Sequence, residues 1–248
     1  MTASDLDVRL SAAALRPEAL HGRVVVVVDV FRAGSAVVTA LANGARAVVP
    51  AADLGQAGRL AATLDADTVL VGGDRDGEPL EGYLTPSPAS FPRHIAAGRT
   101  VVLTTANGTE ALALARAADT TVVASFLNAS RAAAYVHSAV RAGQPATLLC
   151  AGSGGRLALE DVLCAGLLLS RFVRPDQVPA LGDAAQAAYA LYAGSHARLD
   201  AALAGSAQAR RLVSLGAGAD VAACTRLDTV DVLPVLSDGR LVDPDRAG

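Results

Sequence analysis

The chain contains no lysine and no tryptophan, and each of its 21 basic residues is an arginine. The absence of lysine excludes a phosphate-binding loop of the GxxxxGKS or GxxxxGKT type and any mechanism that forms a Schiff base on a lysine amine. If the protein binds phosphate or carboxylate groups, it must use arginine, backbone N–H groups, helix N-termini or a metal ion.

Aromatic residues, cysteines and histidines are scarce. Aromatics make up 3% of the 248 residues, against 52% hydrophobic and 18% charged, which is typical of a globular protein with a core of Val, Leu and Ala. The three widely spaced cysteines, Cys150, Cys164 and Cys224, fit reduced thiols in a cytoplasm. The four histidines show no HExxH or paired spacing, which argues against a zinc hydrolase site.

Charge and hydropathy indicate the compartment and the partners. The net charge is −3 with no basic patch, which argues against nucleic acid as a partner. The N-terminal stretch MTASDLDVRL is acidic and lacks the apolar core of a secretory signal, and no apolar run approaches the ~18 residues of a membrane span. We therefore expect a cytoplasmic protein with no membrane contact. The Ala-rich helices would suit a homodimer, but nothing in the sequence specifies one.

Apolar runs that end in polar loops recur along the chain. Five valines at 24–28 are typical of a strand buried on both faces, and they lead into Asp29 and Arg32. Similar runs lead into polar loops and then helical stretches. They lie at 68–73, 100–105, 121–125 and 146–152. This alternation predicts an α/β fold, a three-layer α/β/α arrangement with a mostly parallel sheet. We expect one domain over 1–248, and whether it is bilobed stays open.

The remaining segments are assigned more coarsely. We expect a strand at 47–49, a helix over 53–65, helical structure from 183 to 213, a helix over ADVAACTRL and a short strand in DVLPVL. Residues 78–93 carry four prolines and no clean period, so we expect a long loop that could serve as a lid.

In open α/β sheets the ligand lies outside the carboxyl ends of the strands. Asp29 and Arg32 stand there, as ligand-binding groups or as a buried ion pair that ties the turn together. Oxygen ligands for a hard cation are also available in the loops. The candidates are Asp29, Asp74, Asp76, Glu78, Glu81, Glu160 and Asp161. Adjacent helical residues point ~100° apart, so we expect one of Glu160 and Asp161 to face the site, and we favour Glu160.

Two glycine-containing loops could bind an anion. Asn107, Gly108 and Thr109 open a helix whose N–H groups could serve as donors, although Asn-Gly alone is more typical of a tight turn. The segment CAGSGGR, from Cys150 to Arg156, resembles the phosphate loop of cysteine-dependent phosphatases. It lacks that family's His before Cys150 and Ser or Thr after Arg156, and a buried structural cysteine is the favoured interpretation.

Taken together, the loops resemble one family. In order, the chain contains DVFRAGSAVVTALANGA, GGDRDG, TTANGTEAL, ASFLNA and CAGSGGRLALEDVLCAG. These look like the 2-phosphosulfolactate phosphatases of the coenzyme M pathway, and SHARL and DVAACTRLDTVDVLPV are similar to the family's C-terminal pattern. The resemblance implies an Mg²⁺-dependent phosphatase that converts (R)-2-phospho-3-sulfolactate to 3-sulfolactate and phosphate.

The resemblance also implies the site residues. We expect Asp29, Arg32 and Glu160 to be catalytic. The Mg²⁺ ligands are expected from Asp29, Asp74, Glu160 and Asp161, and whether Asp29 is instead a nucleophile stays open. The substrate, a small phosphate ester with a carboxylate and a sulfonate, is expected to contact Asn107, Gly108, Thr109, Ser125, Asn128, and Arg75 or Arg156.

This chain departs from the family pattern in three places. Gly34 stands where we expect Thr, Asp74 where we expect Glu, and GYLTPSP at 82–88 replaces a longer GFDxGNSP-like segment. Two alternatives therefore stay open beside the Mg²⁺-dependent phosphatase. One is a metal-free cysteine phosphatase that uses Cys150 and Arg156, and the other is a non-catalytic protein that binds a small organic anion.

Overall fold

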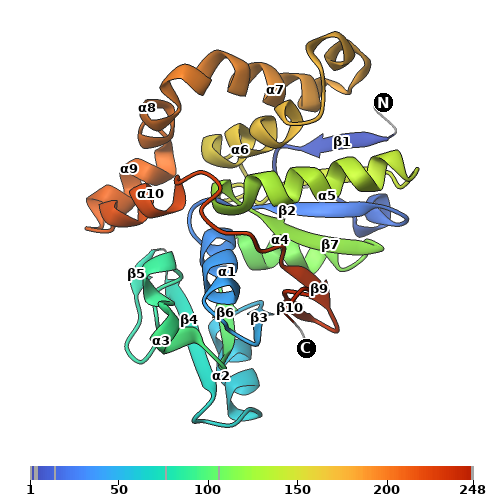
Figure 1. Ribbon diagram of the computed structural model, residues 1–248. Helices are drawn as coiled ribbons and strands as arrows, with labels where there is room; N and C mark the ends of the chain where they lie inside the picture. Colours follow the sequence, from blue (N-terminus) through green and yellow to red (C-terminus); the bar gives the residue numbers. More distant parts are fainter. Residues whose placement is uncertain (1, 3–4, 14, 76, 106, 247–248) are drawn as a thin grey trace.

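The computed structural model describes residues 2, 5–13, 15–75, 77–105 and 107–246, and of Arg75 and Pro79 it describes the backbone alone. The candidate ligand Asp76 lies outside the described residues. The fold is α/β, with a mostly parallel sheet between layers of helices (Figure 1).

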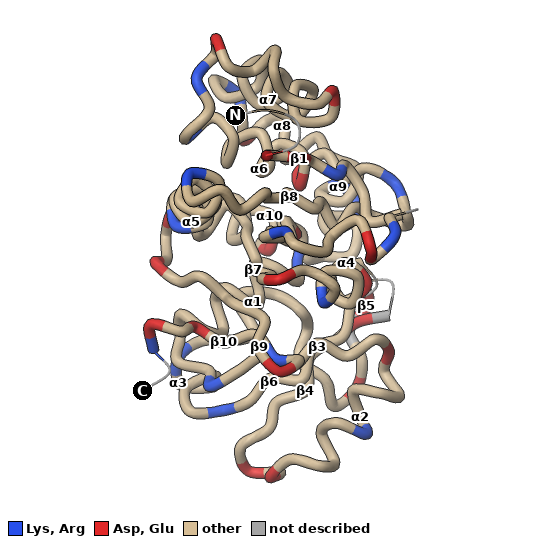
Figure 2. Tube along the Cα trace, turned by 90° about the vertical axis from the view of Figure 1, so that its right-hand side faces the viewer, with Lys and Arg blue, Asp and Glu red and all other residues tan. Residues whose placement is uncertain are grey.

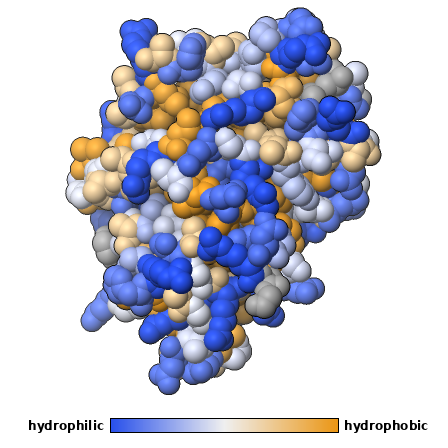
Figure 3. Space-filling model, viewed as in Figure 1, coloured by the Kyte–Doolittle hydropathy of each residue, from blue (hydrophilic) through white to orange (hydrophobic). Residues whose placement is uncertain are grey.

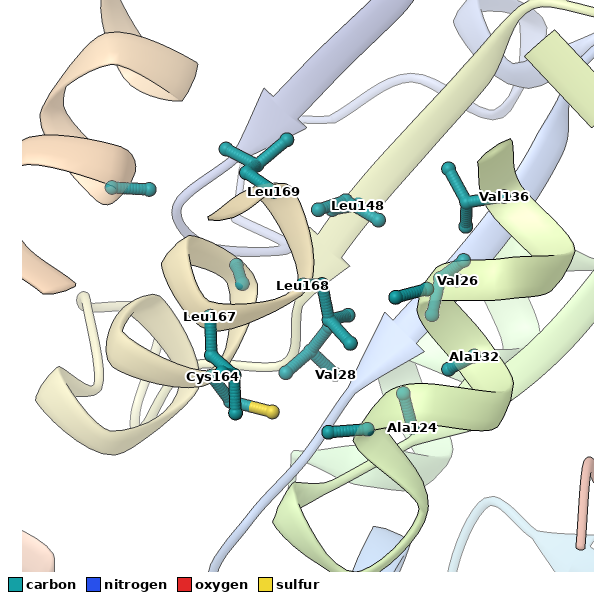
Figure 4. Packing of buried hydrophobic residues seen from close by; sticks show 14 of the residues in the cluster. Val26, Val28, Ala124, Ala132, Val136, Leu148, Cys164, Leu167, Leu168 and Leu169 are labelled. Atoms are coloured by element: carbon teal, nitrogen blue, oxygen red, sulfur yellow. The ribbon is translucent and has the colours of Figure 1, made fainter. Parts of the chain in front are cut away.

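The five valines form strand β2 (Val24–Val28), and both of its faces are buried. Val24, Val26 and Val28 pack in one hydrophobic cluster, with side chains of helices α5 (Ala129–Arg141) and α6 (Leu159–Ser170). Figure 4 shows Val26 and Val28 against Leu148, Leu168 and neighbouring apolar residues in that cluster. Val25 and Val27 pack in a second cluster, with helices α1 (Ala33–Ala42) and α4 (Gly108–Ala115). Because side chains alternate along a strand, an all-apolar run fits a strand covered on both sides.

The described strands run in the order β1-β8-β2-β7-β9-β10-β3-β6-β4-β5. Two groups are parallel, β1-β8-β2-β7 and β3-β6-β4, and the antiparallel hairpin β9–β10 joins them through β7 and β3. The strands besides β2 are β1 (Leu6–Arg9), β3 (Ala47–Ala51), β4 (Val69–Arg75), β5 (Glu78–Pro79), β6 (Thr100–Thr104), β7 (Thr120–Ala124), β8 (Ala146–Cys150), β9 (Val235–Ser237) and β10 (Arg240–Val242).

Helices follow most of the parallel strands and cover both faces of the sheet (Figure 1). The α-helices are α1 (Ala33–Ala42), α2 (Leu54–Ala62), α3 (Arg93–Ala96), α4 (Gly108–Ala115), α5 (Ala129–Arg141), α6 (Leu159–Ser170), α7 (Asp183–Ser195), α8 (Leu199–Ala204), α9 (Ala207–Ser214) and α10 (Gly218–Cys224). Short 3-10 helices are η1 (Pro17–Leu20), η2 (Pro88–Ser90), η3 (Phe126–Asn128), η4 (Pro175–Ala180) and η5 (His196–Arg198). Helix α7 packs on α6, and the chain then leads through α8 to α9 and α10 beside β5 (Figure 1).

The proline-rich segment at 78–93 is held to the body of the protein at several points. The backbone of Leu84 bonds to Val71 and Gly73 of β4, at 2.8 Å in each direction. Ser87 is buried and Phe91 is fully enclosed, as expected for a segment that packs on the core. The segment between β5 and α3 is therefore mostly the long loop expected from the sequence, and these contacts pack it against the body of the protein.

Charged residues of both signs are scattered over the chain in Figure 2. The face in Figure 3 is largely hydrophilic, with hydrophobic residues scattered over it in small groups. Within the described ranges, every helix is too short or too polar to cross a membrane.

Candidate active site

A pocket of about 230 Å³ opens at the carboxyl ends of β2, β4, β6 and β8. The loops of both parallel groups of strands therefore build it together. Its lining comes from these four loops, from the proline-rich segment and from helix α9. The residues are Asp29, Phe31, Arg32, Ala33, Asp74, Gly77, Pro86, Thr105, Asn107, Gly108, Gly152, Ser153, Gly154, Gln208 and Arg211.

Asp29 follows β2 directly and is buried. Its carboxylate accepts hydrogen bonds from the backbone N–H groups of Ala33 and Gly34 at the start of α1. Burial raises the pKa of Asp29 from 3.8 to about 6, and the nearby charges of Glu160 and Asp74 act in the same direction. An acid with a perturbed pKa in a pocket is typical of a functional site.

Two glycines allow other backbone segments to approach Asp29. A Cβ atom on Gly108 would lie less than 3.0 Å from Asp29 Oδ2, so the β6–α4 loop reaches the carboxylate only because it carries glycine there. A Cβ atom on Gly34 would lie less than 3.0 Å from the Asp29 carbonyl oxygen. The departure from Thr at position 34 thus coincides with a backbone approach that leaves no room for a side chain.

Arg32 lies at the N-terminus of α1, and its side chain is 5% exposed. Nη2 donates to Asp74 Oδ2 at 2.5 Å, and Nη1 donates to Asp220 Oδ2 at 2.9 Å. Arg32 also lines the pocket. It is a buried ion-pair partner, as one of the two interpretations of the sequence held, but its partners are Asp74 and Asp220 and not Asp29.

The β6–α4 loop adds polar groups to the same wall. Asn107 Oδ1 accepts the N–H of Gly154 at 2.9 Å, which links this loop to the β8–α6 loop. Thr105 also lines the pocket, and its buried Oγ1 has no hydrogen-bond partner among the described residues. An unpaired buried hydroxyl costs free energy, and at a functional site it marks a place where a ligand can supply the partner.

Both members of the acidic pair at the start of α6 are buried, whereas the sequence predicted that one would face the site. Asp161 accepts the N–H of Val30 at 2.9 Å and that of Gly152 at 3.0 Å, so it clamps the loops after β2 and β8 together. Glu160 accepts a bond from the Ser206 hydroxyl and lines a neighbouring depression that includes Gln208 and Arg211. Burial raises the pKa of both carboxyls. The two side chains are enclosed on different sides of the helix end, one by loops and the other by α9.

Several residues expected to bind substrate are buried supports outside the pocket lining. Ser125 caps η3, and Asn128 accepts the N–H of Ser125 at 3.0 Å and donates to the carbonyls of Val123 and Val232. Thr109 donates to the Thr105 carbonyl. These contacts hold the loops in place, while Gly108 forms the pocket wall itself.

The arginines differ from the expectation as well. Arg156 is exposed and absent from the pocket lining, while the side chain of Arg75 lies outside the described part of the chain. Helix α9 contributes Gln208 and Arg211 instead. Neither stands in a motif, since an Arg in an exposed helix of a protein with 21 arginines carries no local signature.

Cys150 ends β8 in the core and is completely buried. Burial raises the pKa of its thiol well above 9.0, and the charge of Asp161 acts in the same direction. A phosphatase nucleophile needs an accessible thiolate with a lowered pKa. The structure therefore contradicts the cysteine-phosphatase alternative based on Cys150 and Arg156.

The pocket offers a hard cation the oxygen atoms of Asp29 and Thr105, but its described residues hold no larger cluster of ligands. Within the described residues, no three His, Cys, Asp or Glu side chains gather in a way that could hold a metal ion, so the four expected ligands do not form one cluster. However, Mg²⁺ is commonly held by one or two carboxylates together with substrate phosphate and water. Asp29, with the unpaired Thr105 hydroxyl in the same pocket, fits such a site.

Comparison with known proteins agrees with the loop motifs. A family model described as 2-phosphosulpholactate phosphatase matches residues 10–239. A protein of Thermotoga petrophila named probable 2-phosphosulfolactate phosphatase is 37% identical over 218 residues, which cover 88% of this chain and 90% of that protein. A protein of the same name from Symbiobacterium thermophilum is 35% identical over 226 residues, 91% of this chain and 96% of the other.

The match spans every residue that lines the pocket, from Asp29 after β2 to Arg211 on α9. The chain belongs to the 2-phosphosulpholactate phosphatase family, a family of phosphoric monoester hydrolases.

Proposed function

We propose that this chain hydrolyses 2-phosphosulfolactate to 3-sulfolactate and phosphate, and that the reaction depends on Mg²⁺. The observation that carries the proposal is the placement of Asp29 and Arg32 in one pocket, on a loop within the region that the family model matches. A carboxylate and a guanidinium side by side supply the two kinds of group that a phosphate-monoester site needs, an anchor for a cation and a donor for phosphoryl oxygens.

The phosphoryl group would lie between Arg32 and the N-terminus of α4. Arg32 contacts the phosphoryl oxygens while its other N–H groups stay bonded to Asp74 and Asp220. The N–H groups at the start of α4 and the Thr105 hydroxyl add further donors. Donors fixed in this way stabilise charge as it redistributes in the transition state.

Asp29 is the residue we assign to hold Mg²⁺, with help from Glu160 and Asp74, whose charges act on its pKa. When bound, Mg²⁺ would neutralise charge on the phosphoryl group. The raised pKa of Asp29 fits this assignment, because a buried carboxylate beside other acids is stabilised by a cation. In the reaction, the oxygen of a water molecule bonds to phosphorus, the bond from phosphorus to the ester oxygen breaks, and that oxygen takes up a proton.

The carboxylate and sulfonate of the substrate need their own partners. Gln208 and Arg211 on α9, with Ser153 in the β8–α6 loop, line both the pocket and the neighbouring depression. We assign Arg211 to this role in place of Arg156, since Arg156 does not line the pocket. An arginine suits such a role because its planar fork binds oxyanions in pairs of hydrogen bonds.

The test is phosphate release from 2-phosphosulfolactate, first with Mg²⁺ and then with excess EDTA. Release with Mg²⁺ that is lost in EDTA is the expected result. Release that persists in EDTA would refute the metal dependence. No release under either condition, together with a saturable thermal shift on adding the substrate, would instead support a non-catalytic binding protein.

A further inference from the structure

Arg32 is held by a carboxylate that does not itself reach the pocket. Asp220 lies in the first turn of α10, is buried and is absent from the pocket lining. Its Oδ2 accepts from Arg32 Nη1 at 2.9 Å, across 188 residues of sequence. Its Oδ1 accepts from the hydroxyl of Ser87 at 2.6 Å, so both oxygens of the carboxylate are engaged.

Two carboxylates accept hydrogen bonds from different nitrogens of the Arg32 guanidinium. Asp74, at the end of β4, binds Nη2, and Asp220 binds Nη1. A single partner would leave an arginine free to swing about that contact, whereas two charge-assisted bonds on different nitrogens fix the plane of the group. Ser87 in turn fixes Asp220, so the chain of contacts runs from the proline-rich segment through α10 to the pocket wall.

We propose that Asp220 is a positioning residue for Arg32, which orients the guanidinium toward the phosphoryl group from outside the pocket. The proposal rests on the proposed function, because it assumes that Arg32 contacts substrate. It also gives the C-terminal helix α10 a role in the reaction through one side chain, and it gives Ser87 a supporting role through the 2.6 Å bond.

A simpler role for Asp220 would be to attach α10 to the rest of the protein. The two roles differ in what happens when Arg32 is already changed. A positioning residue has nothing left to orient in that background, whereas a structural residue lowers the activity by the same factor as before. Double-mutant cycles measure this difference directly.

The experiment measures kcat and KM for phosphate release by the whole chain. The single variants are Asp220→Ala, Asp220→Asn, Ser87→Ala and Arg32→Gln. The double variant combines Arg32→Gln with Asp220→Ala. Asp220→Ala is expected to lower kcat/KM about 30-fold, while Asp220→Asn, which keeps an oxygen acceptor, restores part of the loss. Ser87→Ala is expected to cost about 3-fold and serves if the Asp220 variants fold poorly. In the Arg32→Gln background, Asp220→Ala should change kcat/KM by less than about 2-fold.

The matched control is Asp243→Asn. Asp243 is equally buried and faces an arginine, Arg246, at 3.4 Å, but neither residue lines the pocket. Loss of Tm without loss of kcat/KM is expected there. Equal losses from Asp220→Ala in the wild-type and Arg32→Gln backgrounds would overturn the positioning role. If Arg32→Gln itself keeps wild-type activity, the assignment of Arg32 in the proposed function is wrong and the positioning role falls with it.

Discussion

Replacing Gly108 with alanine tests the geometry around Asp29 with a single methyl group. That Cβ would lie less than 3.0 Å from Asp29 Oδ2, at 3.0 Å from the Cβ of Ala33 and at 3.2 Å from Thr105 Oγ1. An ordinary carbon–oxygen contact is about 3.3–3.6 Å. The methyl group therefore cannot be accommodated unless the carboxylate or the β6–α4 loop moves by about 1 Å.

A displacement of this size has two separable costs. Misplacing a reacting or ligating group by about 1 Å reduces the rate by a factor of about 100, which corresponds to about 2.7 kcal/mol in the activation barrier. Overpacking a buried position costs about 1–3 kcal/mol of folding free energy. We therefore expect Gly108→Ala to lose about 100-fold in kcat/KM and to unfold at a lower temperature.

The assay is steady-state phosphate release with Mg²⁺, together with thermal unfolding of the same samples. Gly194→Ala is the matched control, since Gly194 lies in α7 with no atom within 4 Å of its added Cβ. Alanine in a helix is favoured over glycine by up to about 1 kcal/mol, so the control should be as stable as the wild type or more so, with full activity. Activity of Gly108→Ala within about 3-fold of the wild type would refute the reasoning.

Three further variants test the other assignments. Asp29→Asn should abolish turnover. The pKa of Asp29 in the folded protein, about 6, lies above its ordinary value of 3.8, so the proton on Asp29 stabilises the fold below pH 3.8. This stabilisation is lost as the pH rises through 6. In EDTA, the Asp29→Asn variant should therefore unfold at a higher temperature than the wild type at pH 7 but not at pH 4. Cys150→Ser should keep most of the activity, and inactivation of the native protein by a small thiol reagent without unfolding would contradict the burial of that thiol. Thr105→Val should unfold at the same temperature or higher, since it removes an unpaired buried hydroxyl, yet should lower kcat/KM; unchanged kinetics would show that the hydroxyl does not contact substrate.

The sequence predicted the parallel strands well because their burial on both faces leaves a local pattern. The runs at 24–28 and 146–150 contain only residues that fit a fully covered strand, apart from Thr147, and each is followed by a polar loop. The sequence did not predict β1 and β10, because LDVR and RLV are short and mix charged with apolar residues. The helical stretch expected from 183 to 213 is divided by η5 and by the turn at Gly205.

The site could be predicted in part for the same reason. Asp29, Arg32, Asp74 and Gly108 lie at or shortly after the carboxyl ends of parallel strands, so the topology alone brings them to one edge of the sheet. Asp220 and Arg211 were not predicted as site residues, because α9 reaches the pocket, and α10 reaches Arg32, only through the tertiary path of the chain. Asp220 opens the segment DVAACTRLDTVDVLPV, which resembles the family's C-terminal pattern, but that resemblance gives its side chain no partner, and Arg211 stands in no motif.

The hairpin β9–β10 has a consequence for the order in which the protein can assemble. Residues 235–242 follow every other described strand in sequence, yet they supply the hydrogen bonds that connect one parallel group to the other. During synthesis each group can pair its own strands early, but the sheet becomes continuous only after these last strands emerge. Since the pocket takes its loops from both groups, we expect it to be among the final parts of the protein to form.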